Sequence, residues 1–285
     1  MSAEMGRSKM PYSRVYIEIT NTCNKNCSFC PGTERKPKRL DERELSFILD
    51  KLSGYTEHVY FHVMGEPLSH PGLIGFIKLA SERGFKTVIT TNGSLLSRRA
   101  EELLSSGLYK INVSLHSFED SPEEQVRYLD GVLDFIRRAP DAGILTVLRL
   151  WNKGTDGGRN GYVIERLRAE YGDGWATDGR GASLRDKLHL EYGERFDWPD
   201  INGEDLGDAV FCHGLGDHFG ILSDGTVIPC CLDRDGVIDL GNVFDSDLED
   251  ILSGERATAM RRGFEKKHAA EELCRKCPYA RRFKI

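Results

Sequence analysis

The sequence predicts an α/β fold, a partial TIM-like barrel of six β/α units followed by a smaller C-terminal domain. Short apolar runs alternate with stretches of helical length over the first two thirds of the chain, which is typical of parallel strands joined by crossover helices. After about residue 203 this alternation gives way to short segments with turn signals such as SDGT and DRDG. We therefore expect an N-terminal tail over residues 1–11, the barrel over 12–203 and the second domain over 204–285.

The β/α units follow one another in regular order. Strands are expected over 15–20, 57–63, 86–91, 110–115, 143–151 and 188–192, the last with the weakest pattern. Helices are expected over 41–52, 72–84, 97–107, 121–138 and 160–171. The first helix has Asp41 at its N-cap and Glu44 three residues later, and the second helix ends at Gly84. Barrels of this kind carry their functional side chains in the loops that follow the strands, so a site is expected there.

Composition and charge argue against several classes of function. The formal net charge of −6 gives no global reason for nucleic-acid binding, although basic runs at 35–39 and 261–267 leave it open. No stretch approaches the roughly 18 consecutive apolar residues of a membrane span. The N-terminus also lacks the apolar segment of a signal peptide. We therefore expect a cytoplasmic protein that has no membrane partner.

The cysteines fall into two groups. Eight cysteines are many for a chain without an export signal, and in a reducing compartment they more often bind metal or do redox chemistry than form disulfides. The first group is Cys23, Cys27 and Cys30; the second is Cys212, Cys230, Cys231, Cys274 and Cys277. No cysteine lies between the groups. The distribution predicts two separate sites.

The first group lies in CNKNCSFC, just after the first predicted strand. A zinc site would need a fourth ligand, and no further His or Cys follows nearby. An ordinary ferredoxin cluster also uses four cysteines. A four-iron cluster held by three thiolates would leave one iron free to bind another ligand.

The CxxxCxxC spacing, with Phe29 before the last cysteine, resembles the signature of radical S-adenosylmethionine (SAM) enzymes. The resemblance implies that Cys23, Cys27 and Cys30 hold a [4Fe-4S] cluster whose free iron chelates the amino and carboxylate groups of SAM. It implies that the reduced cluster cleaves SAM to a 5′-deoxyadenosyl radical, which abstracts hydrogen from the substrate. The electron would come from an external donor such as flavodoxin or ferredoxin.

Other strand ends fit the same family. VMGEP at 63–67 resembles its GGEP motif, with Met64 in place of the first glycine. The resemblance implies that Gly65 and Glu66 bind the SAM ammonium through a backbone carbonyl and the carboxylate. The remaining residues that it implies at the SAM site are Phe29, Pro67, Thr91, Asn92, Ser114, His116 and Arg149.

Three of these assignments have alternatives or conditions. Asn92 lies in an Asn-Gly pair that is equally typical of a plain turn. His116 would face either SAM or the substrate. Arg149 stands among apolar residues and needs a partner if it is buried, and the resemblance pairs it with the SAM carboxylate.

The second group contains a GxxxxC pattern that ends at Cys230 and a distal CxxC. By spacing alone, four such thiolates suit a zinc site or a fully ligated four-iron cluster equally. The arrangement resembles the C-terminal SPASM extension of radical SAM enzymes, or its shorter one-cluster form called twitch. The resemblance implies an auxiliary [4Fe-4S] cluster whose ligands are Cys212, Cys230, Cys274 and Cys277, with Cys231 as a spectator.

The resemblance covers residues 12 to 280 or so and implies a radical SAM oxidoreductase or maturase. In twitch-bearing relatives the auxiliary cluster accepts an electron from the substrate radical, so the net reaction is a two-electron oxidation. The alternatives are a peptide- or RNA-modifying maturase and a non-catalytic iron–sulfur or zinc-binding protein. A mere carrier would not need the set formed by Glu66, Ser114 and Arg149. The sequence identifies neither the substrate, a small molecule or a peptide, nor its catalytic residues. We favour the stretch 190–200 as a cover for the barrel edge over a substrate contact.

Overall fold

The computed structural model describes residues 10–119, 121–177 and 180–283, so most of the predicted tail lies outside the described residues. Its strands are β1 (Arg14–Ile17), β2 (His58–Tyr60), β3 (Lys86–Thr91), β4 (Lys110–Ser114), β5 (Leu145–Lys153), β6 (Ala176–Thr177), β7 (Gly181–Arg185), β8 (Leu188–Glu194), β9 (His218–Ile221) and β10 (Val227–Ile228). They form one ten-stranded sheet in the order β10-β9-β1-β2-β3-β4-β5-β8-β7-β6. The strands from β9 to β8 in this order run parallel, whereas β10, β7 and β6 pair antiparallel at the two edges.

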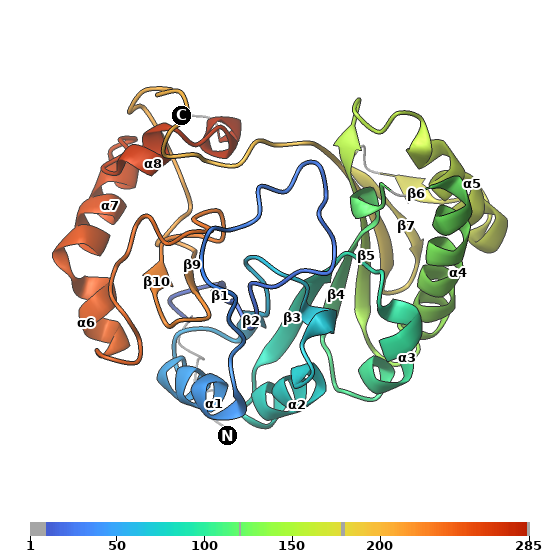
Figure 1. Cartoon of the computed structure of the whole chain (residues 1–285), viewed down its shortest axis with the longest axis horizontal. Coiled ribbons are helices and arrows are strands. Elements are labelled where there is room, and N and C mark those ends of the chain that lie inside the picture. The colour runs from blue at the N-terminus through green and yellow to red at the C-terminus, as the bar shows by residue number, and fades with distance from the viewer. Residues whose placement is uncertain (1–9, 120, 178–179, 284–285) are drawn as a thin grey trace, which may run out of the picture.

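The helices lie outside the curved sheet. They are α1 (Glu42–Lys51), α2 (Leu73–Glu82), α3 (Leu96–Leu104), α4 (Pro122–Arg138), α5 (Arg159–Tyr171), α6 (Leu248–Ser253), α7 (Glu255–Glu265) and α8 (Glu272–Arg275). In Figure 1, α1 to α5 follow the convex side of the strands, and α6 to α8 form a separate group near the C-terminus. The predicted capping box of α1 is confirmed, because Asp41 and Glu44 each accept the other's backbone N–H. None of the described helices combines the length and the apolar character needed to span a bilayer.

The predicted α/β partial barrel is confirmed. The six expected strands are β1 to β5 and β8, and the five expected helices are α1 to α5. The region 152–187, where the sequence pattern was weak, adds β6 and β7, which extend the sheet beyond β8.

The C-terminal region joins the same sheet. Strand β9 pairs parallel with β1 over four residues, including Val15 with Phe219 and Ile17 with Ile221. The sequence gave no sign of this pairing, because the two strands are about 200 residues apart and their partners are chosen by the tertiary fold. The boundary near residue 203 therefore stays a prediction.

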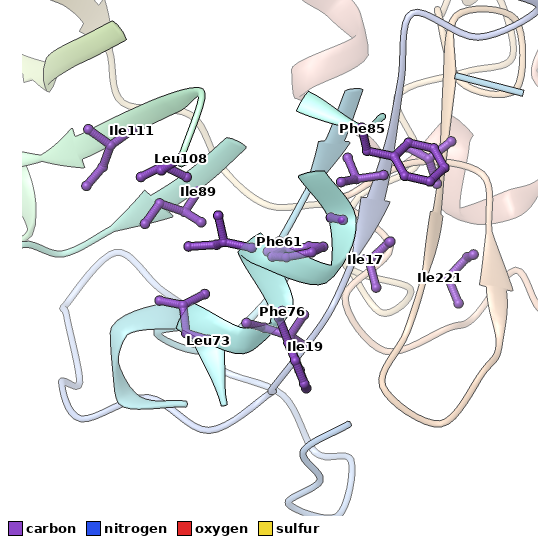
Figure 2. Packing of buried hydrophobic residues seen from close by; sticks show 14 of the residues in the cluster. Ile17, Ile19, Phe61, Leu73, Phe76, Phe85, Ile89, Leu108, Ile111 and Ile221 are labelled. Atoms are coloured by element: carbon purple, nitrogen blue, oxygen red, sulfur yellow. The ribbon is translucent and has the colours of Figure 1, made fainter. Parts of the chain in front are cut away.

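Alternation along the strands sorts side chains onto two faces of the sheet. Ile17, Ile89 and Ile111 are fully buried on one face and lie in the same apolar cluster as Leu73 and Phe76 of α2 (Figure 2). Burial of each such side chain contributes roughly 1.5–3 kcal/mol. The opposite, concave face is left to polar and aromatic side chains, and that face carries the site.

Candidate functional site

The loop between β1 and α1 carries the first three cysteines across the concave side of the sheet (blue in Figure 1). All eight cysteines are free thiols. Ser28 donates its backbone N–H and its hydroxyl to the two carboxylate oxygens of Glu119, at 2.6 and 2.5 Å. The Cys27 thiol donates to the Ser117 carbonyl, 3.5 Å away. The loop is thus fixed by contacts with the residues after β4.

The thiols of this loop affect one another electrostatically. Burial raises the pKa of Cys27 to about 12, and Glu119, Cys23 and Cys30 push it in the same direction. Burial also raises the pKa of Cys23. Three neighbouring thiolates are therefore unfavourable by themselves, and a bound cation that ligates them would remove that cost. A set of three mutually interacting thiols on one loop fits a cluster that takes three protein ligands.

Gly65 permits a close approach between two loops. Its φ is +78°, and a Cβ at this position would lie 2.3 Å from the Thr20 carbonyl oxygen. The next residue, Glu66, donates its backbone N–H to the Thr22 carbonyl at 3.0 Å. The MGEP turn can therefore lie directly against the start of the cysteine loop only because residue 65 has no side chain.

The Glu66 carboxylate has a different environment from the one expected. It is only 1% exposed and accepts from the Leu68 N–H (2.9 Å), the Thr91 hydroxyl (2.6 Å) and the Asn92 N–H (2.7 Å). Burial raises its pKa, and these three hydrogen bonds oppose the rise. A carboxylate has about four acceptor positions, so most are already used inside the protein. Its observed role is to fix the end of β3, next to the short turn that begins at Pro67.

Asn92 connects this framework to the cysteine loop. Its side-chain amide donates to Asn24 at 3.0 Å and lies 3.9 Å from the Cys23 sulfur. Its backbone carbonyl accepts from the Tyr128 hydroxyl at 2.9 Å. Gly93 follows with a φ of +79°. The Asn-Gly pair is therefore a turn, as one interpretation of the sequence had it, and also a support for the first cysteine.

Phe29, His116 and Arg149 meet around Trp151. The His116 ring lies 5.2 Å from the Phe29 ring and is stacked on Trp151 at 6.5 Å. Its Nδ1 is 3.0 Å from the Arg149 carbonyl, and burial lowers its pKa, so the ring is neutral at pH 7 and donates from Nδ1. The Arg149 guanidinium lies 4.4 Å above Trp151 and donates from Nε to Glu191 at 3.1 Å. Arg149 thus already has the partner that a half-buried charge requires.

One cavity of about 460 Å³ connects the two predicted sites. The predicted SAM-site residues in its wall are Phe29, Ser114, His116 and Arg149, and all five C-terminal cysteines are in the wall as well: Cys212, Cys230, Cys231, Cys274 and Cys277. The other predicted SAM-site residues (Gly65, Glu66, Pro67, Thr91 and Asn92) are not in its lining and form the framework described above. Arg195, Phe196 and Trp198 also line it. The expectation that 190–200 only covers the barrel edge was therefore wrong.

The C-terminal cysteines arrive from three segments. Gly225, in the hairpin between β9 and β10, has a φ of +91°, and a Cβ there would lie 2.4 Å from Asn242 and Phe244. This hairpin delivers Cys230, whereas Cys274 belongs to α8. Burial raises the pKa of both thiols well above the usual value. Within the described ranges, no three His, Cys, Asp or Glu side chains are grouped for a single metal ion.

Sequence reasoning missed Glu18, which ties the two sites together. Its carboxylate is completely buried, pairs with Arg35 of the cysteine loop at 2.5 Å and accepts from the Met64 N–H at 3.2 Å. It also accepts from the hydroxyl and N–H of Ser223, beyond β9, at 2.9 and 3.2 Å. A usable signal was present, because an acid inside the strand VYIEIT must find partners if the strand is buried.

Comparison with family models decides the membership of the chain. Residues 17–153 match the model of the radical SAM superfamily, and residues 212–278 match that of SPASM, an iron–sulfur cluster-binding domain. The chain belongs to the radical SAM superfamily. It carries a C-terminal SPASM domain, and a [4Fe-4S] cluster, SAM and an auxiliary iron–sulfur cluster are the cofactors that this membership implies.

The curated relatives of this radical SAM protein share its barrel region. It is 33% identical over 162 residues to the GTP 3′,8-cyclase of Peptoclostridium acidaminophilum, which is 52% of this chain and 48% of the relative. It is 34% identical over 109 residues to the GTP 3′,8-cyclase of Chlorobaculum tepidum, covering 37% and 33% of the two chains. The radical SAM protein thus spans no more than about half the length of these relatives.

Solved structures resemble the radical SAM protein over most of its length. BtrN in complex with AdoMet and 2-DOIA matches with a TM-score of 0.60 and 19% identity, covering 93% of this chain and 92% of BtrN. The sulfatase-maturase-type structure titled anSMEcpe with bound AdoMet matches with a TM-score of 0.61 and 14% identity, covering 94% and 89%. Streptococcus suis SuiB bound to its precursor peptide matches with a TM-score of 0.54 and 16% identity, covering 94% and 71%. At these identities the likeness shows the fold alone.

Proposed function

We propose that the protein is a radical SAM oxidoreductase that oxidises a substrate held in the central cavity. When bound, the first cluster and SAM supply a 5′-deoxyadenosyl radical that takes hydrogen from the substrate, and the auxiliary [4Fe-4S] cluster supplies an acceptor for the remaining electron. The observation that carries the proposal is the shared cavity. Its wall contains Phe29 of the cysteine loop and, elsewhere, the thiols of the SPASM region.

The residues of the first site would divide into ligands and supports. Cys23, Cys27 and Cys30 would hold the cluster that takes its electron from an external donor such as flavodoxin or ferredoxin. Asn92 and Glu119 fix the loop that presents these thiols. Three thiols are what the family's cluster requires, which supports this assignment.

The SAM-binding roles follow from position in the cavity wall. Ser114 and His116 end β4, and neutral His116, with its Nδ1–H on the Arg149 carbonyl, offers Nε2 as an acceptor. Arg149 uses Nε for Glu191, so its terminal nitrogens remain for the SAM carboxylate. We assign Gly65 a backbone contact to the SAM ammonium. Glu66, with Thr91, acts mainly by holding that turn in place.

In the second site we assign the four ligand positions to Cys212, Cys230, Cys274 and Cys277. Four thiolates would complete the coordination of a [4Fe-4S] cluster, which favours electron transfer over binding of substrate to an open iron. Cys231 is the remaining thiol and also reaches the cavity wall. Under this proposal the barrel spans 12–203 and the auxiliary domain 204–285.

The first test is cleavage of SAM without substrate. The anaerobically reconstituted and reduced protein is expected to release 5′-deoxyadenosine slowly, which chromatography detects. Ser114→Ala is expected to slow release, whereas Ser105→Ala, a change in a hydroxyl at the C-terminal end of α3, serves as the matched control. A fully loaded wild-type protein that never releases 5′-deoxyadenosine would instead support the alternative of an iron–sulfur carrier.

A further inference from the structure

The lining of the central cavity is basic. It includes Arg14, Arg149 and Arg195, and four histidines, but no Asp or Glu among the described residues that line it. Arg149 is already assigned to SAM. The other two arginines therefore need a different explanation, and they lie at different places in the wall, on β1 and after β8.

Arg14 keeps hydrogen-bonding capacity on the cavity side. One of its terminal nitrogens donates to Asp217 at 2.8 Å, and Asp217 is not part of the cavity lining. Its Nε is buried and has no hydrogen-bond partner among the described residues. Since a guanidinium has five N–H donors in a rigid fork, Arg14 can bind an acid behind it and an anion in front of it.

Arg195 lies beside the cysteine loop. Its guanidinium is 5.6 Å from the centre of the Phe29 ring, and in the described part of the chain it forms no ion pair. Its side chain is exposed where the cavity opens. An unpaired arginine at this place costs nothing in water and gains most from an anionic ligand.

The deeper wall holds polar atoms that also lack partners. His62 Nδ1 is buried without a hydrogen bond to any described residue, while its Nε2 lies 3.3 Å from the Thr90 hydroxyl. Burial and then Arg149 lower the pKa of His62 to about 3, and burial and then Arg14 lower that of His218 to about 4. Both rings are therefore neutral at pH 7, and they respond to a field that is already positive.

We propose that the substrate is an organic anion whose carboxylate or phosphate group is received by Arg14 and Arg195. Its carbon skeleton would pack on the aromatic part of the wall, where Phe196 lies 5.7 Å from Trp198 and 5.1 Å from Tyr279. A cationic amine would meet no carboxylate in this lining. The inference rests on the proposed function only in taking this cavity as the substrate site.

The test compares probes of one shape and three charges. Benzoate, neutral benzamide and cationic benzylammonium are titrated calorimetrically into anaerobic holoprotein saturated with SAM, so that the SAM site is closed to them. Benzoate is expected to bind about tenfold more tightly than benzamide, because its charge adds to the hydrogen bonds with arginine. Benzylammonium is expected to bind most weakly. Phenyl phosphate, as a fourth probe, distinguishes a phosphate site from a carboxylate site by its affinity relative to benzoate.

Variants locate the effect. Arg195→Gln is expected to remove most of the preference for benzoate, and Arg195→Lys to restore part of it. Arg185→Gln serves as the control, because Arg185 pairs with Asp141 at the surface and does not line the cavity. Equal binding of the three probes, no binding of benzoate at about 20 mM, or a preference unchanged in Arg195→Gln would each overturn the proposal. A changed cluster reduction potential in Arg195→Gln with unchanged benzoate binding would mean that Arg195 serves the cluster, and would overturn it too.

The two proposals can fail separately. The titration needs no SAM cleavage, so selective benzoate binding by a protein that never forms 5′-deoxyadenosine would disprove the radical function alone. Cleavage of SAM together with no preference for the anion would disprove the substrate class alone.

Discussion

The two cysteine groups are built in opposite ways. Cys23, Cys27 and Cys30 lie within one eight-residue stretch, whose loop is fixed by hydrogen bonds from Glu119 and Asn92. The C-terminal thiols come from segments spread between residues 212 and 277 and meet only at a cavity wall. The first site is therefore preformed by the barrel, whereas the second depends on the tertiary fold of a small region. Cluster binding should stabilise the second site far more than the first, because ligation there joins distant parts of the chain.

The largest expected effect is on chemistry at the first site. Changing Cys23, Cys27 and Cys30 together to Ala should reduce 5′-deoxyadenosine release to background, because no ligands for the first cluster remain. The thermal unfolding of the variant should stay close to that of the wild type, since the loop keeps its hydrogen bonds. Residual release well above the iron-free control would contradict the assignment.

The matching change in the second site should have the reverse pattern. The triple variant of Cys212, Cys274 and Cys277 to Ala should keep SAM cleavage within about threefold of wild type but unfold more easily, by about 3 kcal/mol or more. With a substrate in hand, deuterium should still pass from it to 5′-deoxyadenosine while oxidised product is lost. Loss of that deuterium transfer as well would mean that the second cluster serves binding or folding and not electron uptake.

Glu18 is the link between the two regions. Glu18→Gln removes the charge that balances Arg35 in a buried site, and it should lower the unfolding free energy by about 3 kcal/mol. Denaturant unfolding measures this. Glu170→Gln, which breaks an exposed pair with Arg137, should cost about 1 kcal/mol or less. Equal effects of the two changes would show that Glu18 does not hold the regions together.

The smallest expected effect is a pH dependence from the cavity wall. The pKa of His62 is lowered to about 3 in the folded protein, so below pH 6.5 the unfolded chain binds a proton that the folded chain does not. Stability is therefore present above pH 6.5 and is lost as the pH falls. His62→Gln should reduce the loss between pH 7 and pH 5.5 by about 1 kcal/mol. A similar reduction in His268→Gln, whose side chain is 54% exposed, would show that the effect is not specific.

The sequence predicted what depends on local spacing. The CxxxCxxC motif, the strand–helix alternation and the capping box at Asp41 are all short-range patterns, and each was found as expected. The pairing of β9 with β1 was not predictable, because a parallel pair over such a separation leaves no local signal. The direction of the Glu66 carboxylate was equally hidden, since a motif identifies a residue and not the hydrogen bonds that it makes.

The cavity shows the same limit. Arg14, His62 and Arg195 come from separate strands and loops, and only the curvature of the sheet brings them into one wall. In the sequence, each looks like an ordinary polar residue in or near a strand. Stretch 190–200 was noticed for its composition, but its contact with the cavity follows from the position of β8 next to β5.

The central claim is that the protein holds two separate four-iron clusters on the two cysteine groups. Iron, sulfide and zinc are counted in anaerobically reconstituted wild type and in both triple cysteine variants. The account predicts about eight iron and eight sulfide per chain in the wild type and about four of each in either variant. Four iron and one zinc in the wild type, or a single variant that loses all the iron, would contradict it.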